Sequence, residues 1–327
     1  MTQLKVFDIF SGSGGYSLGF EQAGMETVAF CEYEGYAKRV LNKHWPTIPI
    51  YDDVRDVTAT MLTDDNIDFD VICGGFPCQD ISIAGKNKGL LEGERSGLWR
   101  EFRRLIDETK PKYAIIENVS ALLSRGLDII LQDLAEIGYD ATWTMLDSQY
   151  FGVPQRRRRV YIVAVRDGIP EGTDLFRFVE RSDAAVKRKT LHLEESRNWN
   201  FEQDQERSYP FAYFTRQRSD QFSCKGVAST IMKRDYKDFT DLILDSNGIR
   251  KLAVTERLSL QGYDTDFFDN CGLSNVESHM LNGMTVPVVK WLGEQIIQFD
   301  QAVRDGTGAA AYTQPAEKTT FSQLFDD

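Results

Sequence analysis

Short apolar runs alternate with amphipathic stretches through the first half of the chain. Apolar residues at strand spacing occupy residues 4–9, 27–31, 48–51, 70–74, 113–119, 141–146 and 160–165. Stretches with helical spacing follow most of the early runs, at 16–24, 33–44, 98–109 and 121–137. Strands that alternate with helices are typical of βαβ units, whose parallel strands are buried on both faces. The pattern therefore predicts an α/β fold with a doubly wound, mostly parallel sheet.

The pattern changes after residue 166. From Asp167 to about Asn247 the periodicity is poor, and charged residues interleave with aromatic ones. Helical spacing returns at 250–263 and again at 288–303. We therefore predict two domains, a first one of residues 1–166 plus 248–304 and a second, smaller, irregular or β-rich one of residues 167–247. The small and polar residues 305–327 are expected to form a flexible tail.

Bulk composition excludes several classes of protein. The 327 residues are 42% hydrophobic and contain no apolar run of 18 residues, so no membrane span is expected. The first residues lack the form of a signal peptide. The five cysteines are scattered and form no CxxC pair, which indicates neither a disulfide framework nor a zinc or other metal site. A cytoplasmic protein with reduced thiols is expected.

Charge is unevenly distributed along the chain. The net charge of −12 argues mildly against a polyanionic partner. Between Pro154 and Ser259, however, 21 Lys and Arg stand against 16 Asp and Glu, a local excess of five positive charges. This region begins with four consecutive arginines, residues 156–159. One face could therefore meet a phosphate backbone, although a solvated basic edge is the simpler alternative.

A glycine-rich turn, Gly12-Ser13-Gly14-Gly15, separates the first strand from the first helix. Such a turn lets the backbone and the helix N–H groups approach a ligand, although taken alone it is interpreted equally well as a plain tight turn. Glu32 ends the second strand, about twenty residues later, where an acid can bind ribose hydroxyls. Tyr33 could stack on a purine, and Asp53 either faces the adenine or is a solvated turn residue. Together these residues favour an adenosine-type ligand.

Cys78 follows the strand 70–74 in a turn that contains two glycines and a proline. The carboxyl end of a strand in such a sheet is where catalytic groups lie, so Cys78 is a candidate nucleophile. A lone cysteine more often fills a gap in the core, by about two to one. Glu117 ends the next apolar strand, where desolvation would raise its pKa and suit it to hold a proton. Its alternative role is to cap the following helix. The polar segment 79–96 is long enough to form a closing lid.

These motifs, taken in order, resemble the cytosine-5 DNA methyltransferase family of the bacterial or phage type. The resemblance rests on Asp8-Ile-Phe10-Ser-Gly12-Ser-Gly14-Gly15, Glu32, Gly75-Phe76-Pro77-Cys78-Gln79, Glu117-Asn118-Val119, Gln155-Arg-Arg157-Arg-Arg159, Arg250-Lys-Leu252 and Gln261-Gly-Tyr263. The chain departs from the family pattern at Ser259, where an arginine is usual, and at Met284, where the family has Gly-Asn-x-Val. Thr285 is expected to take over hydrogen bonding there.

The resemblance implies a chemistry for these residues. Cys78, as a thiolate, would add to carbon 6 of a cytosine flipped out of duplex DNA, while Glu117 would hydrogen-bond ring N3. Arg157 and Arg159 would be the cations beside them. The methyl donor and cofactor would be S-adenosyl-L-methionine. The residues expected to bind it are Asp8, Phe10, Gly12, Gly14, Glu32, Tyr33, Asp53, Val54, Phe76, Pro77, Leu98, Thr285 and Val286. The residues expected to contact DNA are Gln79, Ser82, Lys86, Gln155 and Arg156.

The resemblance also sets expectations about partners and alternatives. Residues 167–247 would form the target-recognition domain that reads a short site in double-stranded DNA. A monomer is expected, with a cognate restriction endonuclease as a conceivable second member of the same system. The nearest alternative is an RNA (tRNA) cytosine-5 methyltransferase, but the Cys-Phe-Thr element usual in that group is absent. A catalytically idle DNA-binding module and a nicotinamide oxidoreductase rank below it.

Overall fold

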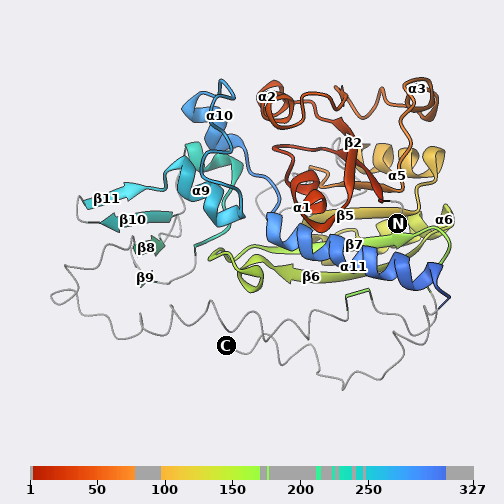
Figure 1. Ribbon diagram of the computed structural model, residues 1–327. Helices are drawn as coiled ribbons and strands as arrows, with labels where there is room; N and C mark the ends of the chain where they lie inside the picture. The colour runs from red at the N-terminus through yellow and green to blue at the C-terminus, as the bar shows by residue number, and fades with distance from the viewer. Residues whose placement is uncertain are drawn as a thin grey trace, which may run out of the picture.

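The computed structural model describes residues 3–77, 97–169, 175–176, 211–214, 223–224, 228–237, 241–245 and 248–306. Its centre is a seven-stranded sheet with the strand order β3-β2-β1-β4-β5-β7-β6 (Figure 1). The strands are β1 (Lys5–Ile9), β2 (Glu26–Cys31), β3 (Ile50–Tyr51), β4 (Val71–Gly74), β5 (Tyr113–Val119), β6 (Asp140–Asp147) and β7 (Arg158–Val165). The first five are parallel to one another, whereas β7 runs antiparallel to both β5 and β6. The predicted α/β class is confirmed.

Helices cover both faces of this sheet (Figure 1). The described helices are α1 (Gly15–Ala23), α2 (Gly35–His44), α3 (Ala59–Asp64), α5 (Gly97–Thr109), α6 (Leu127–Glu136), α9 (Val254–Gln261), α10 (Asn275–Met280) and α11 (Val286–Arg304). Of these, α9 and α10 lie to one side of the sheet rather than on its faces (Figure 1). Successive residues of a strand point to opposite faces, and β1 follows this rule. Val6 packs with α1 and α11, while Phe7 and Ile9 pack with α5 and α6. β4 and the first four residues of β5 are therefore apolar because both of their faces are buried, whereas the edge strand β6 carries polar residues and is only partly buried.

The second sheet lies apart from the first, beyond α9 (Figure 1). Its described strands are antiparallel in the order β11-β10-β8-β9, namely β8 (Phe211–Phe214), β9 (Ser223–Cys224), β10 (Asp241–Asp245) and β11 (Gly248–Lys251). β11 pairs with β10, so residues 248–251 extend this sheet across the predicted boundary at 248. The division of the chain into domains stays a prediction.

Three local predictions were wrong in detail. The expected helix 250–263 begins only at Val254, because residues 248–251 form β11. The expected helix 121–137 is a 3₁₀ turn, η2 (Ser120–Ser124), followed by α6. The two are separated at Gly126, whose φ of 146° no α-helix accommodates. The short helices α3 and α10 were not predicted, because one or two turns show too little periodicity to be recognised.

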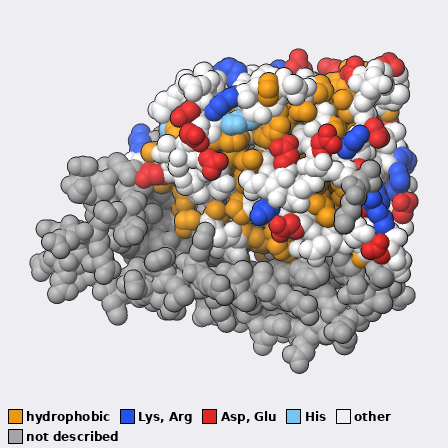
Figure 2. Space-filling model, viewed as in Figure 1, with side chains coloured by type: hydrophobic (Ala, Val, Ile, Leu, Met, Phe, Trp, Pro, Cys, Tyr) orange, Lys and Arg blue, Asp and Glu red, His pale blue; other side chains and the backbone are white. Residues whose placement is uncertain are grey.

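The surface carries charges of both signs. On the face shown in Figure 2, acidic and basic side chains lie intermixed, with apolar side chains between them. Among the described residues, no helix has the length and apolar character needed to cross a membrane.

Candidate active site

The glycine-rich loop after β1 has the backbone geometry of a close-approach turn. Phe10, Gly12 and Gly14 all have positive φ, at 55°, 56° and 78°. This conformation is uncommon for an aromatic residue, and residues held in it cluster at ligand sites. A Cβ on Gly14 would lie 2.5 Å from the Trp45 ring, so only glycine lets the loop pack this closely against Trp45. A Cβ on Gly12 would meet nothing within 4 Å, which leaves open space on the other side for a ligand.

Glu32 lies at the carboxyl end of β2 and joins this loop. Its Oε2 accepts a hydrogen bond from the Gly12 N–H at 2.7 Å, and its Oε1 accepts one from the Glu34 N–H at 2.7 Å. Burial raises the pKa of Glu32 above its ordinary value, while these two hydrogen bonds act in the opposite direction. Each carboxylate oxygen can accept a further bond, so ribose hydroxyls can be held there. Tyr33, which follows, is 72% exposed and available for stacking.

Asp8 lies beneath the loop rather than facing it. Its side chain is fully buried, and its Oδ2 accepts hydrogen bonds from the backbone N–H and the hydroxyl of Ser17. Asp8 thus holds the first turn of α1 against the end of β1. Burial raises the pKa of this carboxyl to about 7, outweighing the two bonds from Ser17.

The other residues predicted to bind the cofactor fall into two groups. Val54, Phe76 and Val286 are buried, whereas Pro77, Leu98 and Asp53 remain partly accessible. The carboxylate of Asp53 is engaged by Arg55, whose Nη2 lies 2.5 Å from its Oδ2.

Thr285 does not point at an open space. Its hydroxyl lies 2.8 Å from that of Ser148, and its side chain is buried. In this structure the hydroxyl therefore joins the start of α11 to the chain that precedes β7.

Glu117 is the centre of a buried charged cluster at the end of β5. Its Oε1 lies 2.9 Å from Arg159 Nε and 3.9 Å from Arg157 Nη2. Burial and the neighbouring Arg159 lower the pKa of Arg157 to about 10, which still leaves it charged at neutral pH. Arg157 Nη1 is buried and has no hydrogen-bond partner among the described residues. An unpaired guanidinium donor in a buried place is costly, so this one is suited to meet a substrate oxygen.

The strand ends bring Glu117 next to the turn that leads to Cys78. A Cβ on Gly75 would lie 2.8 Å from Glu117 Oε2, so only glycine lets the turn pass this close to the acid. The Asn118 side chain donates a hydrogen bond to the Phe76 carbonyl at 3.2 Å, which ties the two strand ends together. Cys78, Gln79, Ser82 and Lys86 lie outside the described residues. Asn118 is a positioning residue that sequence reasoning missed, although it stands inside the Glu117-Asn118-Val119 motif.

Gln155 and Arg156 differ in their surroundings. Gln155 is fully buried, and its amide donates to the Leu260 carbonyl at 2.9 Å. Arg156 is exposed, so its side chain is available to a partner. The predicted DNA contact at Gln155 therefore has no free side chain in this structure, while the prediction for Arg156 stays open.

Tyr263 is a second residue that the sequence did not single out for the site. Its hydroxyl lies 3.0 Å from the Ser13 hydroxyl, and a Cβ on either Gly15 or Gly283 would lie 2.3 Å from the same atom. It braces the glycine-rich loop from the opposite end of the chain. No local spacing could have revealed this contact, because 250 residues separate its partners.

Three features define the class of this protein: the antiparallel strand β7 within the sheet, the glycine-rich loop after β1, and the acid at the end of β2. They are those of the S-adenosylmethionine-dependent methyltransferases. The chain belongs to the C-5 cytosine-specific DNA methylase family, which it matches over residues 4–298. It is thus a DNA cytosine-5 methyltransferase, an enzyme that transfers the methyl group of S-adenosylmethionine to carbon 5 of cytosine. The open space beside Gly12 and the Glu32 carboxylate, which two backbone N–H groups hold in place, fit this cofactor.

Relatives support this family on sequence and on fold. The chain is 30% identical to the Type II methyltransferase M.NgoBI of Neisseria gonorrhoeae over 88% of its own length and 90% of the relative. It is 28% identical to M.HaeII of Haemophilus aegyptius, over 93% and 96% of the two chains. The solved structure of the Dnmt2 methyltransferase of S. pombe has the same fold, with a TM-score of 0.66 at 19% identity over 90% of this chain and 99% of that one.

Proposed function

We propose that Cys78, Glu117, Arg157 and Arg159 carry out the chemistry of cytosine methylation. The observation that carries the proposal is the buried Glu117, held by two arginines and facing Gly75, three residues before Cys78. The Cys78 thiolate adds to carbon 6 of the cytosine, and the electron pair moves toward carbon 5. Glu117 binds ring N3 and supplies the proton that offsets the developing charge there. S-adenosylmethionine, when bound, would supply an electrophilic methyl group to carbon 5 and leave as S-adenosylhomocysteine. The carbon 5 proton then passes to solvent, and its electron pair re-forms the double bond between carbons 5 and 6 as the Cys78 thiolate leaves. N3 returns its proton to Glu117.

The two arginines beside Glu117 have different contacts. We propose that Arg159, which makes the close contact, orients Glu117, and that Arg157, with its unpaired Nη1, receives a substrate oxygen. Orientation of the acid by a fixed partner contributes more where water is largely excluded, and here Glu117 is buried and Arg159 is half-buried.

The cofactor residues are proposed with distinct roles. Gly12, Gly14 and Phe10 shape the cradle, Glu32 binds the ribose and Tyr33 stacks on the adenine. Val54, Phe76, Pro77 and Leu98 would form the apolar wall, with Asp53 at its edge. Asp8, Thr285 and Val286 would support this site from below.

We propose that the macromolecular substrate is double-stranded DNA and that a target-recognition domain of residues 167–247 recognises a short site in it. The first domain would be 1–166 plus 248–304, and the chain would act as a monomer. Gln79, Ser82, Lys86 and Arg156 are proposed backbone contacts. Because relatives such as M.NgoBI are Type II methyltransferases, a cognate restriction endonuclease is proposed as the second member of the system.

The decisive experiment compares the variants Cys78→Ser and Glu117→Gln with the unchanged enzyme. Each protein is expressed in cells that lack cytosine methylation, and methylated cytosines are located by sequencing the genomic DNA. We expect one short methylated site for the unchanged enzyme and none for Cys78→Ser. Glu117→Gln should lower single-turnover transfer by about 10²- to 10⁴-fold while it keeps cofactor affinity. Cys271→Ser and Glu136→Gln, which change the same residue types far from the cluster, serve as controls.

Two outcomes would overturn the proposal. Near-normal methylation by Cys78→Ser would exclude this cysteine as the nucleophile. Unchanged single-turnover kinetics in Glu117→Gln would exclude the acid. Transfer of a tritiated methyl group to tRNA but not to duplex DNA would instead favour the RNA alternative.

A further inference from the structure

Residues 228–237, here named the strap, connect two parts of the active site that are far apart in sequence. By sequence they belong to the predicted second domain, yet they pack on the first. One end lies along the loop that leads into β7: the Ala228 N–H donates to the Pro154 carbonyl, and the Arg156 N–H donates to the Ala228 carbonyl, both at 2.8 Å. The Thr230 hydroxyl donates to the Arg156 carbonyl at 2.8 Å. This end is thus bonded to the residues directly before Arg157.

Gln155 completes this attachment. Its buried amide donates to the Leu260 carbonyl, and its Oε1 accepts a hydrogen bond from the Ile231 N–H at 3.4 Å. One side chain therefore joins the strap, the arginine loop and the end of α9. Arg159 itself is held in the sheet, where β7 pairs with β5 and β6, and the Arg157 N–H donates to Asp147 Oδ1.

The other end of the strap reaches the cofactor acid. Lys233, in the turn η6 (Lys233–Tyr236), has its Nζ 2.9 Å from Glu34 Oε1 and 5.6 Å from the centre of the Tyr36 ring. The Glu34 backbone N–H is one of the two donors that hold Glu32. Lys233 thus fixes the residue that orients the ribose-binding carboxylate.

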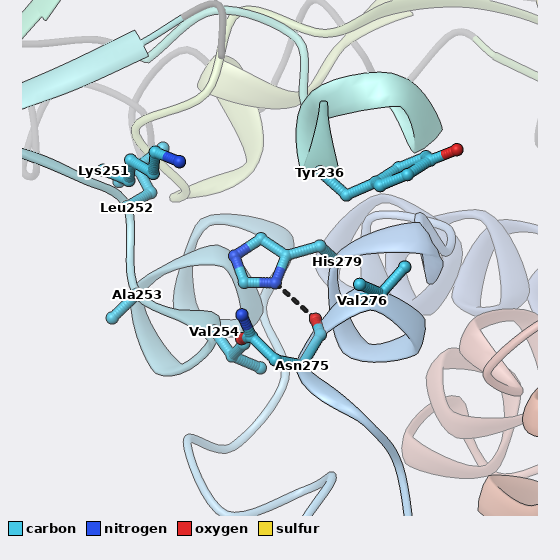
Figure 3. Close-up of a pocket in the computed structure, with 8 residues that line it drawn as sticks. All are labelled: Tyr236, Lys251, Leu252, Ala253, Val254, Asn275, Val276 and His279. Atoms are coloured by element: carbon cyan, nitrogen blue, oxygen red, sulfur yellow. Dashed lines mark hydrogen bonds between the residues drawn. The ribbon is translucent and has the colours of Figure 1, made fainter. Parts of the chain in front are cut away.

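A hollow of about 380 Å³ opens between η6, α9 and α10, with Tyr236, Val276 and His279 on its walls (Figure 3). Elsewhere the strap is held by apolar and polar contacts. Ala228 and Ile231 are buried with Leu252 and Leu260, Asp235 pairs with Arg257 at 3.2 Å, and Lys233 pairs with Glu34. The strap is thus a packed support that carries Lys233.

We propose that Lys233 is a positioning residue for cofactor binding, because its ion pair holds Glu34, whose N–H orients the Glu32 carboxylate. The inference rests on the proposed role of Glu32 in holding the ribose.

The test measures the dissociation constant of S-adenosylhomocysteine, which binds at the cofactor site but cannot react. Lys233→Met keeps the apolar stem over Tyr36 but removes the charge. A half-exposed pair of this kind contributes modestly, so we expect about two- to fivefold weaker binding at low salt. Lys233→Arg should restore the affinity. Lys237→Met is the matched control: it removes a charge that lies 5.2 Å from the centre of the Tyr236 ring but leaves the pair of Lys233 with Glu34 in place, so cofactor affinity should stay unchanged.

A double-mutant cycle with Glu34→Gln separates coupling from structural damage. The two single variants should each weaken binding, and the double variant should be no weaker than either of them. The effect should fade at about 0.5 M salt, where screening acts within a few ångströms.

The outcomes distinguish this inference from the proposed function. If Glu32→Gln leaves cofactor affinity unchanged, the proposed ribose contact is wrong. If Glu32→Gln weakens binding but Lys233→Met does not, only the positioning role is wrong. Equal weakening by Lys237→Met, or additive effects in the cycle, would also overturn it, since either result would show a general charge effect.

Discussion

Replacing Asp8 by asparagine should change the way the stability of the fold depends on pH. The carboxyl is fully buried under the glycine-rich loop, and burial raises its pKa to about 7 from 3.8. The folded state therefore binds this proton more tightly than the unfolded state does. The stability that the proton supplies is complete below about pH 4 and is lost as pH rises toward 7. Above pH 7 a charged carboxylate is buried, and the hydrogen bonds from Ser17 offset only part of its desolvation cost.

The expected size of the effect follows from the shift. Each pKa unit corresponds to about 1.4 kcal/mol, so between pH 5 and pH 7 the carboxyl removes about 2–3 kcal/mol from the free energy of unfolding. An asparagine at this position cannot ionise, and its amide oxygen can still accept both bonds from Ser17. Stability of Asp8→Asn relative to the unchanged protein should therefore rise by about 2–3 kcal/mol over that range and stay level above pH 7. Repulsion from Glu32 is one cause of the raised pKa of Asp8, so the difference between the two proteins includes this interaction.

Urea unfolding at pH 5.0, 6.0, 7.0 and 8.0 measures this difference. Asp68→Asn, which makes the same change at an exposed position, controls for the loss of one acid and should give a difference that does not vary with pH. If Asp8→Asn loses the same amount of stability at every pH, the loss comes from packing, and the dependence of the difference on pH can still be measured. A difference between the two proteins that is flat from pH 5 to pH 8 would refute the reasoning.

Three further predictions follow from other contacts. Gly75→Ala places a Cβ 2.8 Å from Glu117 Oε2, so single-turnover transfer should fall by about ten- to a hundredfold with cofactor affinity intact; unchanged transfer would show that the acid tolerates displacement. Thr285→Val breaks the bond to Ser148 and should cost about 1–3 kcal/mol in urea unfolding while cofactor affinity stays within about twofold; a large loss of affinity would instead make Thr285 a direct ligand. Arg257→Met removes the cation that faces the buried Asp235 and should cost about 3–5 kcal/mol, part of which Arg257→Met with Asp235→Leu should recover; the idea fails if the double variant is less stable than the single one.

Much of the central sheet was predictable from the sequence because its strands are apolar on both faces and its helices are long. Prediction from the local sequence failed where pairing with a distant segment determines the local structure. Residues 248–251 look like the start of a helix, yet they pair with β10 and become a strand. Residues 121–137 look like one helix until Gly126 breaks it. Strand pairing outweighs local propensity, since its hydrogen bonds come from residues elsewhere in the chain.

The sequence by itself determined the family and the chemistry, because these depend on residue types in a fixed order: a glycine loop, an acid after the second strand, a cysteine turn, a second acid and an arginine run. The tertiary structure decided which residues act on which. It placed Arg159 rather than Arg157 in close contact with Glu117, and it buried Gln155 as a connection to the strap. It also brought Tyr263 under the glycine-rich loop from the far end of the chain. Spacing along a chain specifies a motif, whereas contacts across 76 to 250 residues exist only after the sheet has assembled.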